Sequence, residues 1–306
     1  MRNIIMLLIS KRIFKQLLLA GLIPLFIVSC GGSSDDKTGT ISVRMTDAPI
    51  DGVNVRVYVQ FSAIELHGEG GTQRIEYNPP KQIELTQLTE GNTADFINSL
   101  EIPTGRYQWI RLDVDTDQDL DTYIDINGTP FELSIPSGDN NGLKLHSSFD
   151  VVENEHSIYV IDFDLRKSIT VTVNGQNISY KLRPTLRLLD ESRVGVISGT
   201  VDLANYSCDD TGNAVYIYEG LDLISDDEGS NNPPIASAQV KYDDATQTYR
   251  YKAAFVHHGE YTVALTCMAD MDDPETDDDI VFFDPQNASV IKRNTLTIDF
   301  PSDVAP

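Results

Sequence analysis

The chain has 306 residues, and its 47 acidic and 23 basic side chains give a formal net charge of −24 at pH 7. Such an excess of carboxylates excludes nucleic-acid binding, because neutralising phosphates requires clusters of Lys and Arg. The same excess repels anionic lipid head groups, favours solubility and attracts divalent cations.

The start of the chain is basic and then apolar. Four basic and no acidic side chains precede Cys30, and residues 17–28 form an apolar run interrupted only by Gly21 and Pro24. This order is typical of a secretory signal peptide, here residues 1–29. The run is too short to cross a bilayer comfortably as a helix, although a transmembrane anchor remains the alternative. Removing the signal peptide leaves a net charge of about −28.

The four residues at the end of this run, residues 27–30 (IVSC), resemble the lipobox of bacterial lipoproteins. The resemblance implies cleavage before Cys30, acylation of Cys30, and attachment of the protein to a membrane through that lipid anchor. The small polar residues that follow predict a flexible tether over residues 30–38. Gly31 stands where the sorting rules of lipoproteins place an inner-membrane retention Asp. We therefore expect an outer-membrane lipoprotein of the cell envelope, facing the periplasm or the surface.

Two further cysteines, Cys208 and Cys267, remain once Cys30 is lipidated. An even pair in an exported chain predicts a disulfide. Closing a loop of this length stabilises the fold by about 4 kcal/mol in the chain-entropy model. Two unrelated buried thiols are the alternative.

Alternation of apolar and polar residues dominates the first half of the chain and predicts half-buried strands. The alternating segments are residues 40–45, 53–59, 107–114, 157–163 and 169–173. Asn127-Gly128 stands between the short segments 123–126 and 131–133, and Asn174-Gly175 stands between residues 169–173 and 178–182. Each pair predicts a hairpin turn. Only residues 94–100 carry a helical spacing, sufficient for one short turn of helix.

A fresh series of short strands begins after a boundary that we place near residues 191–193. The predicted strands are residues 195–201, 214–218, 236–242, 248–255, 260–267, 280–283 and 296–300. Their spacing is typical of a β-sandwich. The sequence thus predicts an all-β, mainly antiparallel fold with two β-sandwich-like domains, residues 39–191 and 192–306, behind the cleaved signal peptide.

One local pattern occurs in both predicted domains. Residues 102–107 (IPTGRY) and 256–261 (VHHGEY) each place a Gly two positions before a Tyr that enters a strand. The Gly supplies a permissive backbone for a turn. We interpret the pattern as a fold signature and not as a catalytic site.

The first predicted domain resembles a bacterial lipoprotein domain family, domain of unknown function 4382. The matching stretches are residues 39–49 (GTISVRMTDAP), 102–107, 163–168 (FDLRKS) and 182–186 (LRPTL). The resemblance covers about residues 38–190 and implies an architecture but no activity.

The second domain resembles transthyretin-like sandwiches of the carboxypeptidase regulatory-like and Cna B types. That resemblance implies a stalk, a spacer or a carbohydrate-binding-like fold. Residues 222–234 depart from it as an acidic insertion.

The sequence Thr46-Asp47-Ala48-Pro49 follows a predicted strand. Asp47 can accept backbone N–H groups and Pro49 can fix the exit of the chain, so a structural turn is our main interpretation. A ligand or ion site is the alternative.

Five aspartates recur at every second position and would share one face of a strand. They are Asp113, Asp115, Asp117, Asp119 and Asp121. Their mutual repulsion can be relieved by calcium, which takes six to eight oxygen ligands. The spacing fails as an EF-hand, because Gln118 and Ile124 replace the required Gly and Glu. A solvated acidic loop is the alternative to a tentative calcium site, and the run over residues 270–279 is a second candidate.

No motif of a hydrolase elbow, a zinc protease or a phosphate-binding loop occurs in the chain. Trp109, the single Trp, is interpreted as core and not as a sugar-stacking platform. We therefore expect a non-enzymatic, membrane-anchored binding or scaffold protein, with calcium as an optional cofactor and an envelope protein or glycan as partner. A carbohydrate-binding or carbohydrate-processing surface lipoprotein is the alternative.

Overall fold

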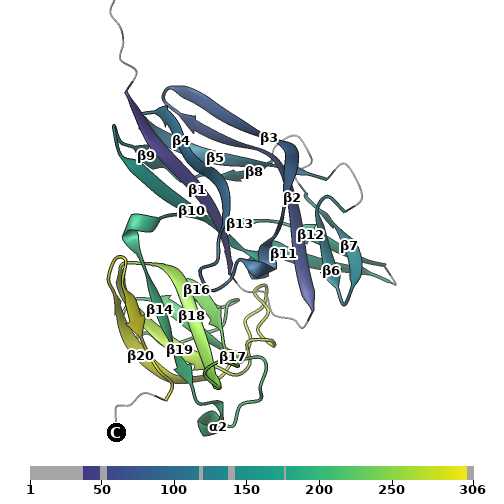
Figure 1. The fold of residues 1–306 in the computed structure, drawn as a ribbon. Coiled ribbons are helices and arrows are strands. Elements are labelled where there is room, and N and C mark those ends of the chain that lie inside the picture. The colour runs from purple at the N-terminus through teal and green to yellow at the C-terminus, as the bar shows by residue number, and fades with distance from the viewer. Residues whose placement is uncertain (1–36, 49–53, 117–119, 137–141, 176, 302–306) are drawn as a thin grey trace, which may run out of the picture. The chain divides into compact units, whose positions relative to one another are not determined.

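The protein is described by a computed structural model that covers residues 37–48, 54–116, 120–136, 142–175 and 177–301. The described chain is all-β, as predicted, and its strands form four sheets that are mostly antiparallel (Figure 1). Within the described ranges, helix is confined to four short segments: the 3₁₀ turns η1 (Leu85–Gln87) and η2 (Glu191–Arg193), and the single turns α1 (Leu165–Ser168) and α2 (Leu203–Tyr206).

The first sheet has four strands in the order β13-β10-β1-β4. Their bounds are Thr38–Ala48 for β1, Ala94–Pro103 for β4, His156–Asp164 for β10 and Thr185–Asp190 for β13. Strand β1 pairs with β10 in parallel and with β4 in antiparallel fashion. The apolar side chains of β1, Ile41, Val43 and Met45, are fully buried, as the alternation of the sequence predicts.

The second sheet has nine strands and lies over the same core. A path β11-β12-β7-β6-β2-β5-β8 is extended by β3, which pairs with β2, and by β9, which pairs with β5. The bounds are Val55–Gly68 (β2), Gly71–Glu84 (β3), Gly105–Asp115 (β5), Tyr123–Ile126 (β6), Thr129–Ser134 (β7), Leu143–Leu145 (β8), Phe149–Val151 (β9), Ile169–Asn174 (β11) and Asn177–Leu182 (β12).

Both Asn-Gly hairpins form where the sequence predicts them. Ile126 pairs with Thr129 around Asn127-Gly128, and both turn residues have positive φ, as a two-residue hairpin of this type requires. The second hairpin also forms, but there Asn174 pairs with Asn177 and is the last residue of β11, so the turn begins at Gly175.

The helical expectation for residues 94–100 is wrong, because these residues form the first part of strand β4. Register shifts between β4 and β1 interrupt the regular alternation, and Ser99 has a positive φ of 52°. As a result the adjacent residues Phe96 and Ile97 are both buried. A bulged strand thus reproduces the apolar spacing that a helix would show.

The remaining two sheets have four strands each, in the orders β17-β18-β14-β21 and β16-β15-β19-β20. The first contains β14 (Val194–Val201), β17 (Lys241–Asp243), β18 (Thr248–His257) and β21 (Thr295–Thr297). The second contains β15 (Ala214–Glu219), β16 (Ala236–Gln239), β19 (Gly259–Thr266) and β20 (Phe282–Val290). The predicted strand over residues 236–242 is split at Val240 into β16 and β17, which belong to different sheets.

Each pair of sheets encloses its own apolar core. One core cluster draws its members from residues 41–182 and the other from residues 197–300. A small third cluster joins the pairs, because Val160 and Leu189 of the first contact Val194 and Phe255 of the second. Only the short turn η2 separates β13 from β14, at the predicted boundary. The partition into two independent domains stays a prediction.

The repeated Gly-x-Tyr pattern has the same structure in both halves. The hydroxyl of Tyr107 donates to the carbonyl of Pro103 at 3.1 Å, and the hydroxyl of Tyr261 donates to the carbonyl of His257 at 2.8 Å. In each case the Tyr ties the start of its strand to the residue four positions earlier, as in the tyrosine corner of other sandwiches. The pattern therefore has a structural role in each sheet pair.

Candidate metal centre in the acidic loops

The predicted lipidation site Cys30, together with the signal peptide and most of the tether, lies outside the described residues. Among the helices that the structure describes, none has the length and apolar character needed to cross a membrane. Acylation of Cys30 therefore stays a prediction.

Cys208 and Cys267 form the predicted disulfide. Their Cα atoms are 5.7 Å apart, within the range that a disulfide requires. Cys208 follows α2 and packs against the second core, and Cys267 directly follows β19. The bond therefore fixes the start of the acidic loop that runs from Met268 toward β20.

Thr46 and Asp47 lie at the end of β1 and bind main-chain groups of other segments. The Thr46 hydroxyl donates to the carbonyls of Leu88 and Asn92 at 2.8 and 3.0 Å, and Asp47 Oδ1 accepts the N–H of Leu165 at 3.2 Å. Burial raises the pKa of Asp47 well above its ordinary value. Asp47 thus holds helix α1 against β1, while Pro49 lies outside the described residues.

The alternating aspartates lie at and after the end of β5. Asp113 forms ion pairs with Arg74 and with Arg111, the latter at 3.0 Å. Asp115 Oδ2 accepts a hydrogen bond from the Gln60 amide at 3.5 Å. The two Arg side chains relieve the repulsion at the start of the series. Asp121 lies within the described residues, whereas Asp117 and Asp119 lie outside them. A calcium site formed by all five aspartates therefore stays a prediction.

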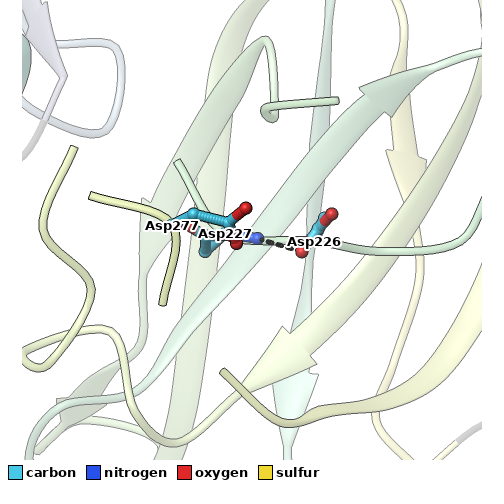
Figure 2. Close-up of side chains that lie close together, drawn as sticks. All are labelled: Asp226, Asp227 and Asp277. Carbon is cyan, nitrogen blue, oxygen red and sulfur yellow. Dashed lines mark hydrogen bonds between the residues drawn. The ribbon is translucent and has the colours of Figure 1, made fainter. Parts of the chain in front are cut away.

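A different set of carboxylates converges in the second sheet pair. Two groups have ligand oxygens that lie within 4.8 Å of one another: Asp226, Asp227 and Asp277 (Figure 2), and Asp227, Asp272 and Asp278. They join the insertion over residues 222–234 to the run over residues 270–279. The sequence indicated both acidic segments but not that they meet. The signals available were the acidic insertion and the disulfide that begins the second loop.

Asp227 is common to both groups and is fully buried. Its Oδ2 accepts the N–H groups of Gly229 and Asp278 at 2.9 and 3.1 Å, which links the two loops. Its Oδ1 is buried and has no hydrogen-bond partner among the described residues. A buried carboxylate oxygen without a partner is rare and costly, so it marks Asp227 as a candidate ligand.

The two loops are held against each other by several contacts. A Cβ atom at Gly229 would lie 1.6 Å from the carbonyl oxygen of Thr276, so only Gly permits this approach. The Tyr218 hydroxyl contacts both the N–H and the carbonyl of Asp226. Asp278 Oδ2 accepts the N–H of Asp273 at 2.7 Å, which closes the second loop on itself. These contacts fix the positions of the carboxylates where the two loops meet.

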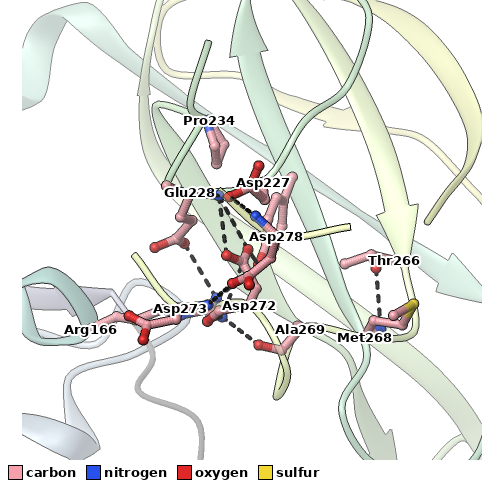
Figure 3. A network of polar contacts seen from close by, with 12 residues as sticks. Arg166, Asp227, Glu228, Pro234, Thr266, Met268, Ala269, Asp272, Asp273 and Asp278 are labelled. Carbon is pink, nitrogen blue, oxygen red and sulfur yellow. Dashed lines mark hydrogen bonds and ion pairs between the residues drawn. The ribbon is translucent and has the colours of Figure 1, made fainter. Parts of the chain in front are cut away.

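Beside this centre, Arg166 of α1 enters the acidic loops from the first sheet pair (Figure 3). Its guanidinium donates to the Tyr216 hydroxyl at 2.9 Å, to Glu228 Oε1 at 3.3 Å, and to the carbonyls of Ala269 and Asp272. The exposed fractions of the ionic side chains are 8% for Arg166, 4% for Glu228 and 0% for Asp272. The network is therefore a buried ionic contact between the two halves of the chain.

The surroundings of Glu228 disfavour its charged form, although Arg166 lies beside it. Burial raises its pKa to about 7, and the charge of Arg166 opposes that rise. Its second oxygen, Oε2, is buried and lacks a hydrogen-bond partner among the described atoms. The charge of Arg166 therefore offsets only part of the negative charge of the acidic loops.

Further hydrogen bonds and ion pairs join the two halves of the chain. Arg187, which also pairs with Asp162, donates to the carbonyl of Ile235 at 2.7 Å. In the opposite direction, Lys241 forms an ion pair with Glu90 at 2.9 Å. Polar contacts therefore flank the small apolar cluster on more than one side.

Trp109 is half-buried on the outer face of the nine-stranded sheet and lies outside both cores. The His67 ring stacks on its indole at 4.6 Å, and Lys144 Nζ lies 4.0 Å from the ring centre. Since His67 lies on the neighbouring strand β2 and Lys144 on the opposite neighbour β8, the indole is enclosed from two sides. The prediction that Trp109 belongs to the core is therefore wrong. Its indole is also not an open platform for a sugar.

Comparison with known proteins identifies one family. Residues 38–184 match the model of the family described as domain of unknown function (DUF4382). No curated protein matches the chain.

Solved structures with some likeness to the chain include three bacterial proteins. The Bacillus anthracis TIE protein is 11% identical, with 86% of this chain and 34% of that one covered at a TM-score of 0.20. The minor pilin GBS52 of Streptococcus agalactiae is 11% identical, with 87% and 98% covered and a TM-score of 0.19. The major pilin subunit BcpA of Bacillus cereus is 10% identical, with 86% and 99% covered and a TM-score of 0.20. The chain spans about a third of the length of the first of these.

Proposed function

Residues 38–184 form a domain of the DUF4382 family, and on that premise we propose that the chain is a lipid-anchored, non-enzymatic scaffold or binding protein of the cell envelope. The anchor is a lipid on Cys30, and the outer membrane is the site that residues 27–31 favour. The partner is an envelope protein that recognises the folded surface.

The observation that supports a scaffold is the buried contact made by Arg166. A guanidinium that spans from α1 to two buried carboxylates ties one sheet pair to the other. The small cluster around Val160 and Phe255 adds apolar contact, and η2 leaves no flexible linker between β13 and β14. A rigid junction holds the second sheet pair in a fixed position relative to the sheet pair next to the lipid anchor. A scaffold requires such rigidity.

The positions of the buried carboxylates favour a non-enzymatic role. An enzyme of this kind would combine a concave site with a carboxylate of raised pKa. Burial raises the pKa of Asp47, Asp162 and Glu228, and none of them lines the two hollows of about 630 and 650 Å³ in the second sheet pair. The enclosed indole of Trp109 likewise favours a protein partner over a glycan.

Two measurements test the proposal. Metabolic labelling with a fatty-acid analogue should tag the wild-type protein in membranes, and Cys30→Ala should be unlabelled and released. Equal labelling of both proteins would exclude the anchor.

Calorimetry tests the rigid junction. We expect residues 37–301 to unfold in one cooperative transition, because the two cores share buried contacts. Two separate transitions in the wild-type protein would show that the halves are independent and would contradict the scaffold.

A further inference from the structure

The carboxylates of Asp226, Asp227 and Asp277 come together from two loops that are distant in the sequence. Asp226 and Asp227 lie in the insertion after β15, and Asp277 lies in the loop between β19 and β20. No ion pair between described residues involves any of the three. Like charges at such distances repel one another and would separate the loops unless something compensates them.

The nearby cation is already engaged elsewhere. The guanidinium of Arg166 donates to Glu228 Oε1 and to the carbonyls of Ala269 and Asp272. These groups lie outside the trio of Asp226, Asp227 and Asp277. The repulsion at the trio calls for a second positive charge.

Asp227 provides an independent indication of a ligand. Its side chain is fully buried, Oδ2 is satisfied by two N–H groups, and Oδ1 has no hydrogen-bond partner in the described part of the chain. The two N–H groups fix the orientation of the carboxylate, as the supporting hydrogen bonds of metal ligands do. An oriented carboxylate with one unused oxygen is suited to coordinate a cation.

We propose that Asp226, Asp227 and Asp277 bind one divalent cation that fastens the insertion after β15 to the loop before β20. Asp227 is the buried, oriented ligand, while Asp226 and Asp277 approach from the two loops and leave positions for water. The site is distinct from the alternating aspartates after β5 and does not depend on the lipid anchor.

The donor set selects calcium among the common cations. All three ligands are carboxylates, and hard oxygen donors suit Ca²⁺ and Mg²⁺ better than Zn²⁺ or Cu²⁺, which favour His and Cys. Mg²⁺ demands a near-ideal octahedron, whereas Ca²⁺ accepts irregular sets of six to eight oxygens completed by water. Three carboxylates on two loops form an irregular set. Extracellular calcium modules of low ligand number bind in the range of about 10⁻⁴–10⁻³ M.

Isothermal titration of the purified, chelator-treated protein with CaCl₂ tests the proposal, with MgCl₂ as a second titrant. We expect one calcium site of about 10⁻⁴–10⁻³ M and weaker magnesium binding. Asp277→Asn, at an exposed position, should weaken calcium binding by about tenfold or more, because it removes a charged ligand and keeps the shape of the side chain. Asp279→Asn is the matched control, since it removes the same charge from the same loop outside the trio.

Terbium provides a second readout at the same position. Tyr218 contacts the main chain of Asp226, so Tb³⁺ at the trio should show emission sensitised by excitation of tyrosine, and excess CaCl₂ should abolish it. Lack of calcium binding by the wild-type protein would overturn the proposal. Unchanged binding by Asp277→Asn, or equal weakening by Asp277→Asn and Asp279→Asn, would also overturn it, because only general charge attraction would then remain.

Discussion

Replacement of Arg166 by Met removes the cation at the junction of the two sheet pairs and keeps most of the aliphatic volume. The guanidinium donates hydrogen bonds to Tyr216, Glu228, Ala269 and Asp272, and the side chain is only 8% exposed. Its loss would leave the carboxylates of Glu228 and Asp272 buried without a cation. The substitution therefore creates uncompensated buried charge as well as lost contacts.

The expected cost follows from that burial. Removing one partner of a buried ion pair costs about 3–5 kcal/mol, whereas an exposed pair contributes about 0–1 kcal/mol. For a body of this size, such a loss lowers Tm by about 6–20 °C. Because the contact joins two cores, we also expect the single unfolding transition to broaden or divide.

Chemical denaturation and calorimetry of Arg166→Met measure this effect, with Arg250→Met as the control. Arg250 pairs with Asp243 on the surface and is about half exposed, so its loss should cost less than about 1 kcal/mol. In the double variant Arg166→Met/Glu228→Gln, removal of the stranded charge should recover part of the stability. If Arg166→Met is no more destabilising than Arg250→Met, the contact does not fasten the two halves.

Three further predictions concern other parts of the chain. Reduction of the Cys208–Cys267 disulfide, whose cysteines are 59 positions apart, should lower the free energy of unfolding by about 4 kcal/mol in urea titrations, and Cys208→Ser/Cys267→Ser should not respond to reductant. Because burial raises the pKa of Asp47, folding stability should fall as pH rises from the unfolded pKa toward the folded one. Asp47→Asn should abolish that fall, so its gain over wild type in thermal melts should be larger at pH 7 than at pH 3.5, and a gain independent of pH would contradict this. Gly229→Ala should cost about 1–3 kcal/mol, since its Cβ would collide with the carbonyl of Thr276, and should weaken calcium binding in the same titration.

The strands and hairpins were predictable because each depends on neighbours in the sequence. Half-buried strands such as β2 and β5 alternate, and Asn127-Gly128 carries the positive φ values that its turn needs. In β10, which was also predicted to be half-buried, residues 159–163 are all buried. The disulfide followed from cysteine parity in an exported chain. Where a bulge breaks the alternation, as in β4, the same reasoning predicted helix, because the spacing of buried residues alone does not separate the two.

The candidate site was predictable only in its parts. Both acidic loops are evident in the sequence, yet the bond between Asp227 and the N–H of Asp278 spans 51 positions. Likewise Arg166 belongs to a stretch that resembles DUF4382 domains, but its partners lie in the other half of the chain. Contacts of this kind depend on how the sheets pack, which local patterns do not specify.

Strand β1 has a consequence for the order in which the chain can fold. It is the first described strand, and it lies between β4 and β10 in its sheet, so Ser42 contacts His156 across 114 positions (Figure 1). A strand so placed can complete its pairing only after the chain as far as β10 has emerged. Pairing between strands that are far apart in the sequence slows folding. The apolar strands stay exposed until their partner strands are available. If the chain is exported, as residues 1–29 predict, that interval falls within and just after translocation, when Val43 and Met45 would be open to chaperones and proteases.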